Sequence, residues 1–204
     1  DWGVTGVQTC ALPILYKTGV SEIISKGQSS ISSTKKLVKK ILLLILLFQT
    51  SAFSQGLGKA YFAGGCFWCM EESFEKKDGV LEVVSGYSGG TTINPTYKEV
   101  TYGKTGHFET IEIIFNKDLI NYNDLLNHFW KNIDPFDEYG QFCDKGYSYR
   151  SVDFYENVEQ KDLIEKSMIK LEKKFNKKIV TYVRKFDKFY KAEDKHQNYY
   201  EEKF

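Results

Sequence analysis

A strand pattern changes to a helix pattern across two consecutive glycines, Gly64 and Gly65. The short apolar run Lys59–Ala63 in front of them predicts a strand, and the glycines allow a tight turn. Behind them, apolar side chains recur at helical spacing through residues 66–76, which predicts a helix. This succession restricts the chain to folds in which a strand turns directly into a helix, and it places Cys66 at the start of that helix.

Cys66 and Cys69 form a C-x-x-C pair in the first turn of the predicted helix. Unpaired N–H groups and the positive end of the helix dipole favour a thiolate there, so a reactive sulfur is predicted. Zinc binding is disfavoured because it needs four ligands, and apart from Cys10 far upstream only Cys143 and three scattered histidines remain. A purely structural disulfide is another alternative, but a catalytic cysteine with a neighbouring resolving thiol fits best.

Further elements follow from the same periodicities. Phe108–Phe115 is the clearest strand, with Ile111 and Ile113 on one face and acidic residues expected on the other. Other strands are predicted at Val80–Val84, Ser151–Tyr155 and Ile179–Val183. Helices are predicted at Tyr97–Tyr102, Asn123–Ile133, Val158–Phe175 and Ala192–Glu202. Loops are predicted at Gly86–Gly90 and Pro135–Gly146. Strands that alternate with helices in this way predict an α+β fold, a two-layer α/β sandwich.

The length of 204 residues suffices for one domain of ordinary size with additional segments. A hydrophobic content of 42% and an aromatic content of 16% predict a folded core rather than disorder. The formal net charge of +1 hides an asymmetry, because residues 1–54 hold six lysines and two acidic residues and the remainder is acidic. An acidic domain without a basic stripe argues against nucleic-acid binding.

Lysines, an apolar run and a short polar stretch stand in the order of a secretory signal peptide over residues 35–54. The apolar run Ile41–Phe48 falls short of the roughly 20 residues that span a bilayer, so stable membrane insertion is not expected. Small residues at Ala52 and Ser54 predict cleavage before Gln55, and therefore an exported protein, periplasmic or secreted.

Residues 1–34 precede this signal and do not resemble part of a domain. No Met occurs before Met70, and the stretch Gly6–Ile14 resembles translated cloning or sequencing-adapter sequence. We therefore expect three parts: a non-native or upstream segment at 1–34, a signal peptide at 35–54, and one folded domain at 55–204.

A series of short motifs resembles the type A peptide methionine sulfoxide reductases. The motifs are Gly65-Cys66-Phe67-Trp68, Gly86-Tyr87-Ser88-Gly89-Gly90, Asn94-Pro95-Thr96-Tyr97, Gly106-His107-Phe108-Glu109, Phe129-Trp130 with Asp134-Pro135, Asp144-x-Gly146, Tyr149-Arg150-Ser151 and His196-Gln197-Asn198-Tyr199. They occur in order from Lys59 to Tyr200 without a disrupted motif. The resemblance implies a mixed sheet with a ferredoxin-like core, and it makes residues 55–204 a catalytic domain that reduces methionine S-sulfoxide, free or in proteins, as repair of oxidative damage.

The resemblance implies four catalytic residues. Cys66, as a thiolate, attacks the sulfoxide sulfur and becomes a sulfenic acid as methionine forms. Glu109, kept protonated by burial, supplies the proton for the departing oxygen. Tyr97 and Tyr149 aim their phenols at that oxygen and stabilise the charge that develops there.

The resemblance also implies how the substrate is held and how the enzyme is recycled. Phe67 and Trp68 form the apolar wall that receives the sulfoxide methyl group, and Asp144 is a polar residue near the resolving step. We expect no bound cofactor and no metal, because the reducing equivalents come from an external dithiol, a thioredoxin-like donor. We also expect no nucleic-acid partner, and a monomer.

The thiol that resolves the sulfenic acid stays open between Cys69, which is nearest in the sequence, and Cys143, which precedes Asp144. Turn geometry favours Cys69, and a single-cysteine cycle regenerated by an external thiol is a further alternative. A general C-x-x-C dithiol–disulfide oxidoreductase is the main competing function; it predicts a thioredoxin-like arrangement and leaves Glu109 and Tyr97 without a role. A secreted binding module with an aromatic groove would tolerate blocked cysteines.

Overall fold

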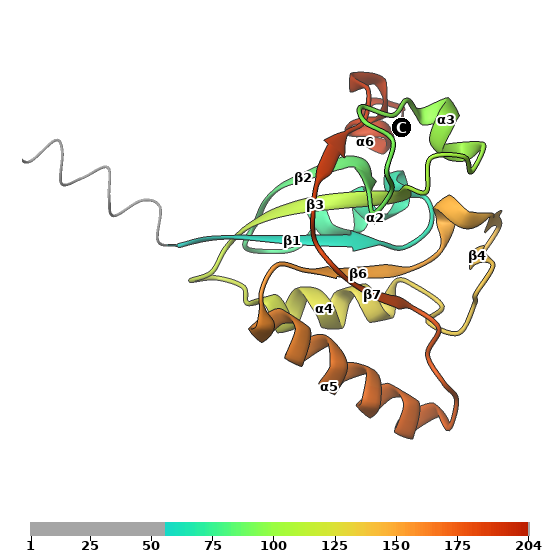
Figure 1. Cartoon of the computed structure of the whole chain (residues 1–204). Coiled ribbons are helices and arrows are strands. Elements are labelled where there is room, and N and C mark those ends of the chain that lie inside the picture. The colour runs from blue at the N-terminus through green and yellow to red at the C-terminus, as the bar shows by residue number, and fades with distance from the viewer. Residues whose placement is uncertain (1–55, 204) are drawn as a thin grey trace, which may run out of the picture. The chain divides into compact units, whose positions relative to one another are not determined.

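A six-stranded mixed sheet lies at the centre of the part of the chain that the computed structural model describes, residues 56–203, with only the backbone for residues 202 and 203 (Figure 1). The strand order is β7-β6-β1-β3-β2-β8. The bounds are Leu57–Ala63 (β1), Val80–Ser88 (β2), Phe108–Asn116 (β3), Val152–Tyr155 (β6), Tyr182–Lys185 (β7) and Phe189–Lys191 (β8). Neighbouring strands are antiparallel except β6 and β7, which are parallel. The predicted signal peptide, residues 35–54, and the upstream segment lie outside the described residues.

Helices occupy most of the connections between these strands, and a 3₁₀ turn and one helix follow the last strand. They are α2 (Phe67–Glu75), α3 (Tyr97–Thr101), α4 (Tyr122–Lys131), α5 (Val158–Phe175) and α6 (Tyr199–Lys203), with 3₁₀ turns at Tyr147–Tyr149 and Asp194–His196. A separate hairpin is formed by β4 (Gly140–Gln141) and β5 (Asp144–Lys145). Within residues 56–203, no helix is long and apolar enough to cross a membrane.

The core of the domain follows the order β1-α2-β2-β3-α4-β6 along the chain. In the sheet these four strands lie as β6-β1-β3-β2, so β3 separates β1 from β2 and runs antiparallel to both. This arrangement is the ferredoxin-like βαββαβ motif. The prediction of an α+β fold with a mixed sheet and a ferredoxin-like core is therefore confirmed.

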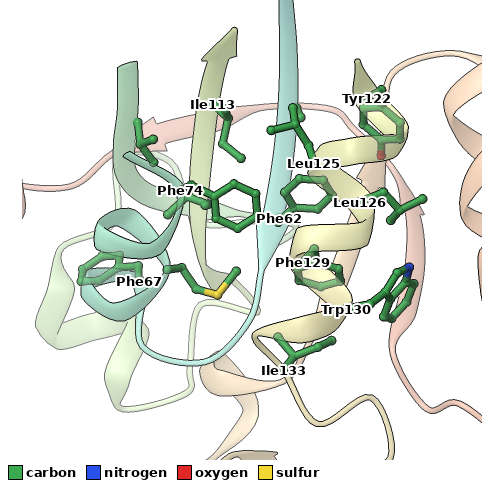
Figure 2. Close-up of a cluster of buried hydrophobic side chains, with 14 of the residues drawn as sticks. Phe62, Phe67, Phe74, Ile113, Tyr122, Leu125, Leu126, Phe129, Trp130 and Ile133 are labelled. Carbon is green, nitrogen blue, oxygen red and sulfur yellow. The ribbon is translucent and has the colours of Figure 1, made fainter. Parts of the chain in front are cut away.

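Two helices bury their apolar sides against the same face of the sheet. Figure 2 shows Phe62 of β1 between the two helices, and its ring lies 5.6 Å from Phe74 of α2 and 4.8 Å from Phe129 of α4. Both helical side chains are fully buried, as is Phe62. A reciprocal capping box between Asn121 and Asp124 begins α4 and fixes where its apolar face starts.

Several element boundaries differ from those predicted. The segment Gly86–Ser88, expected in a loop, extends β2 and pairs with both β3 and β8. The last predicted helix, Ala192–Glu202, is divided into a 3₁₀ turn and α6, because Asn198 adopts a left-handed φ of 49° between them. The strand expected at Ile179–Val183 lies at β7, and the short strand β8 was not predicted.

Candidate active site

Cys66 lies at the junction between β1 and α2, as the strand–turn–helix pattern predicts. It is the N-cap residue of α2 and is half-buried. Gly65 has a φ of +88°, and a Cβ there would come within 2.6 Å of the side chain of Gln141, so glycine is required for two reasons. The turn therefore holds the sulfur of Cys66 at the helix N-terminus and close to the β4–β5 hairpin.

Glu109 of β3 faces the start of α2 from inside the domain. It shares the face of β3 that carries Ile111 and Ile113, whereas the prediction placed the acidic residues of this strand opposite those isoleucines; only Glu112 lies there. Glu109 is 1% exposed, and its Oε2 accepts the backbone N–H of Phe67 at 3.0 Å. Among the described residues its Oε1 has no hydrogen-bond partner. Burial raises the pKa of Glu109 to about 8, so this carboxyl is largely protonated at neutral pH.

Tyr97 and Tyr149 bring their phenols next to this carboxyl from two different segments. Tyr97 is the first residue of α3, which is held in place by a capping box between Thr96 and Glu99. Tyr149 ends the 3₁₀ turn that follows the β4–β5 hairpin. Burial, followed by the nearby charge of Glu109, raises the pKa of both phenols, and the two hydroxyls lie within hydrogen-bonding reach of one another. Both therefore stay protonated and can donate hydrogen bonds.

Aromatic rings gather around the two residues that follow Cys66 in the chain. The ring of Phe67 is buried and lies 5.8 Å from Trp68 and 5.9 Å from Tyr97. Trp68 is partly buried, and its indole Nε1 has no hydrogen-bond partner within residues 56–203. His196 stacks on Tyr97 at 4.3 Å and lies 5.6 Å from Trp68, so it completes the wall. The rings pack against one another at the start of α2.

The two sulfurs of the C-x-x-C pair interact with each other. Cys66, Cys69 and Cys143 are all free thiols. The hydrogen bond between Cys66 and Cys69 raises the pKa of Cys66 above its usual range and lowers the pKa of Cys69 to about 6. The pair consequently holds one proton and one negative charge at neutral pH, and its titration belongs to both thiols together.

The β4–β5 hairpin brings Asp144 to the site and Cys143 close to it. The charge of Asp144 raises the pKa of Glu109 and of both site tyrosines, so it lies near all three groups. Cys143 occupies the exposed turn between the two short strands, two residues after Gln141, which packs on Gly65. The structure thus assembles Cys66, Glu109, Tyr97, Tyr149 and Asp144, and it pairs Cys66 with Cys69 rather than with Cys143.

Two of the aromatic residues that pack on Tyr97 and Trp68 were not predicted from the sequence as part of the site. A structural role is the simplest prediction for His196, and its place in the motif with Tyr199 is the signal that could have found it. Tyr199 stacks on Trp68 at 3.9 Å. His107 accepts the N–H of Gly90 at 3.0 Å and serves the loop instead. No cluster of side chains suited to a metal ion occurs in the part of the chain that the structure describes.

A thiol pair at a helix N-terminus that faces a buried, protonated carboxyl defines a thiol-dependent oxidoreductase. The family model for peptide methionine sulfoxide reductase matches residues 58–204. The peptide methionine sulfoxide reductase MsrA of Streptococcus agalactiae is 52% identical over 144 residues, 70% of this chain and 85% of that protein. The chain therefore belongs to the peptide methionine sulfoxide reductase family, type A.

Solved structures agree with this assignment. Methionine sulfoxide reductase A of Corynebacterium diphtheriae has a TM-score of 0.67 at 28% identity, over 74% of this chain and 76% of that one. Mxr1 of Saccharomyces cerevisiae in its reduced form has a TM-score of 0.69 at 27% identity, over 74% of this chain and 87% of that one. The structure of Mxr1 in complex with Trx2 is 20% identical, with a TM-score of 0.51 over 72% and 86%, and it supports the fold alone.

Proposed function

We propose that this protein reduces the S epimer of methionine sulfoxide, free and within proteins, to methionine, and so repairs oxidative damage. The observation that carries this proposal is the carboxyl of Glu109, which is buried and bonded to the N–H of Phe67 next to Cys66. A sulfoxide oxygen that leaves its sulfur needs a proton. A carboxyl with a pKa of about 8 can supply that proton at neutral pH.

The first half of the reaction transfers oxygen between two sulfurs. Negative charge reaches Cys66 when its proton moves along the hydrogen bond to Cys69. The Cys66 sulfur then attacks the sulfoxide, the bond from the methionine sulfur to oxygen breaks, and the oxygen ends on Cys66 with the proton from Glu109. Methionine sulfur is reduced by two electrons and Cys66 is oxidised to a sulfenic acid. The phenols of Tyr97 and Tyr149 donate to the oxygen as charge develops on it.

The aromatic wall accounts for the choice of a methyl sulfoxide. Phe67 and Trp68 offer ring faces to the methyl group and the polarised sulfur, and such contacts contribute about 0.3–1.5 kcal/mol. The oxygen is oriented toward Glu109 and the methyl toward the rings, which leaves one epimer able to present its sulfur to Cys66. Asp144 adds a fixed negative charge on the hairpin side.

The second half of the reaction forms a disulfide. Cys69 resolves the sulfenic acid in this proposal, because its sulfur already interacts with that of Cys66. Cys143 is the alternative, and its exposed turn would have to approach Cys66. A thioredoxin-like donor then reduces the disulfide in this proposal; Mxr1, which is 27% identical to this chain in its reduced-form structure, has itself been solved in complex with Trx2. The general dithiol–disulfide oxidoreductase predicted a thioredoxin-like arrangement, whereas the fold matches methionine sulfoxide reductases.

The proposal includes export after cleavage before Gln55, and action as a monomer. Support comes from the lysines and apolar run of residues 35–54, and the donor would then be an extracytoplasmic protein. N-terminal sequencing of the protein recovered from the producing cells tests the cleavage. Light scattering of the purified protein tests the monomer, and a dimeric mass would contradict it.

The deciding experiment incubates the purified chain with each epimer of methionine sulfoxide and dithiothreitol while methionine release is followed. We expect release from the S epimer only, and none from the Cys66→Ser variant. Release from both epimers, or turnover that survives in Cys66→Ser, would contradict the proposal. Repeating the assay with thioredoxin in Cys69→Ser and Cys143→Ser identifies the resolving thiol, because only its loss stops the cycle.

A further inference from the structure

The short helix α6 places two adjacent tyrosines on the first turn of α2. The ring of Tyr199 stacks on Trp68 with 3.9 Å between centroids and 10° between planes. The hydroxyl oxygen of Tyr200 lies 3.6 Å from the sulfur of Cys69. Two neighbouring side chains of α6 therefore contact the third and fourth residues of the C-x-x-C segment. Tyr200 and its partner Cys69 are 131 residues apart in the chain.

The segment that leads into α6 is anchored to the sheet. The carboxamide of Gln197 accepts the N–H of Ser85 at 3.0 Å and donates to the carbonyl of Ser85 at 2.9 Å. Asn198 then turns the chain with a φ of 49°, and the buried carboxyl of Glu71 lies against the backbone of this turn. The anchor makes the position of Tyr200 a consequence of the fold rather than of its contact with Cys69.

The contact between Tyr200 and Cys69 has a direction. The pKa of Tyr200 is raised to about 12, chiefly by its hydrogen bond to Cys69, so the phenol keeps its proton and is the donor at neutral pH. Four groups act on the Cys69 sulfur: the Cys66 thiol and the Tyr200 phenol favour its negative charge, and the charges of Asp144 and Glu72 oppose it. Tyr200 is the one donor to Cys69 in the described residues that does not itself take part in the disulfide.

We propose that Tyr200 is a positioning residue for the second thiol: its hydroxyl holds the Cys69 sulfur, with its negative charge, in reach of the oxidised Cys66. This inference rests on the proposed function. In the step concerned, the Cys69 thiolate attacks the sulfur of the Cys66 sulfenic acid, the S–S bond forms and the S–O bond breaks. The hydroxide that leaves takes up one proton and departs as water, and Tyr200 keeps its own proton throughout.

The test compares Tyr200→Phe with the unaltered chain. Iodoacetamide alkylation of Cys69 is measured across a pH series, with fragment mass spectrometry to separate Cys69 from Cys66 on the same peptide. Loss of a hydrogen bond to a charged sulfur should raise the alkylation midpoint of Cys69 by about one pH unit. After one equivalent of sulfoxide, disulfide formation at pH 7 should slow about tenfold, more than methionine release does.

Two further variants keep the test sharp. Tyr102→Phe removes a phenol that is 67% exposed at the end of α3, and it should behave as the unaltered chain. Tyr200→Leu removes the ring as well as the hydroxyl. If only Tyr200→Leu shifts the midpoint, Tyr200 acts through packing and the inference is wrong. The inference is equally wrong if Cys69→Ser cycles normally with thioredoxin, whereas absence of methionine release in the unaltered chain would instead contradict the proposed function.

Discussion

The two ends of α2 lie in opposite kinds of environment. Toward its C-terminal end, Phe74 packs on Phe62 in a core of stacked rings and aliphatic side chains. At its N-terminal end, several buried polar atoms have no hydrogen-bond partner among the described residues: Glu109 Oε1, Trp68 Nε1 and both ring nitrogens of His196, whose Nε2 lies 3.9 Å from the carboxylate of Glu193. An unsatisfied buried polar atom costs about 1–3 kcal/mol. The apolar end stabilises the fold, and the polar end gives up some of that stability to leave acceptors and donors for a substrate.

The largest effect on the polar end of α2 is expected from Glu109→Gln, which keeps an acceptor for the N–H of Phe67 and removes the acid. We expect methionine release to fall about 100- to 10,000-fold, the range for loss of a general acid. Stopped-flow or quenched measurement of the first turnover checks this. Release within threefold of the unaltered rate would show that the proton comes from elsewhere.

The same variant should gain stability. The pKa of Glu109 is about 8 in the folded chain and near 4.5 when unfolded, so folding is favoured fully below pH 4.5 and progressively less as pH rises toward 8. At pH 8 we expect the free energy of unfolding of Glu109→Gln to exceed that of the unaltered chain by about 4 kcal/mol, because stability falls by about 1.4 kcal/mol for each pH unit between the two pKa values. At pH 4 the two should be equal, which urea unfolding at both pH values measures.

Phe62→Ala removes part of the apolar core at the C-terminal end of α2. Its ring is fully buried between Phe74 and Phe129, so its loss should lower the free energy of unfolding by about 3–5 kcal/mol. The rate per folded molecule should stay near that of the unaltered chain, because the rings that Phe62 packs against, Phe74, Tyr122 and Phe129, take no part in the proposed reaction. Urea titration together with an active-site thiol count separates the two effects, and a lowered rate per active thiol would show that the two ends are coupled.

The pH dependence of the first turnover tests which groups at the N-terminal end of α2 must carry a charge or a proton. Negative charge on the cysteine pair requires a pH above about 6, and the proton on Glu109 requires a pH below about 8. The rate should therefore peak near pH 7 and fall about tenfold per pH unit outside these limits. In Glu109→Gln the alkaline limb should disappear while the acid limb remains. An alkaline limb that persists would assign it to another group.

The smallest effect is expected at a buried carboxyl away from the site. Asp153 is fully buried and accepts the hydroxyl of Tyr122 at 3.0 Å, and burial raises its pKa well above the usual value. Burial thus favours its neutral form, which Asn resembles, and Asp153→Asn should change the free energy of unfolding at pH 7 by less than about 1 kcal/mol and leave turnover unaffected. A loss of several kcal/mol would indicate that Asp153 is charged.

Local pattern predicted the elements that hold the site, because those elements have clear periodicity. The bounds predicted for the strand and helix on either side of Gly64-Gly65, and for the strand β3, are close to the observed bounds. Three-residue β8 was missed because an edge strand this short leaves no alternation to detect, and pairing with β2 alone defines it. The break at Asn198 was missed since helical spacing says nothing of a left-handed residue.

The face on which Glu109 lies shows the limit of the same reasoning. An acidic residue at the start of a strand is most simply placed in solvent, yet the period of two puts Glu109 with Ile111. The N–H of Phe67 and the hydroxyl of Tyr149, both supplied by other elements, help to make that burial tolerable. The role of Tyr200 has no local signal at all, because its partner Cys69 is distant in the sequence.

The place of α6 on the cysteine turn has a consequence for the chain while a ribosome is making it. Trp68, Cys69 and the edge of β2 leave the ribosome well before the residues that contact them. Ser88 of β2, for example, donates its hydroxyl to the carbonyl of Lys188, the residue before β8 and 100 residues further along the chain. Until Phe189–Lys191 and α6 emerge, Cys69 lacks its contact with Tyr200 and the edge of β2 is unpaired. The thiols of a nascent chain are thus open to oxidation before α6 has taken its place beside them.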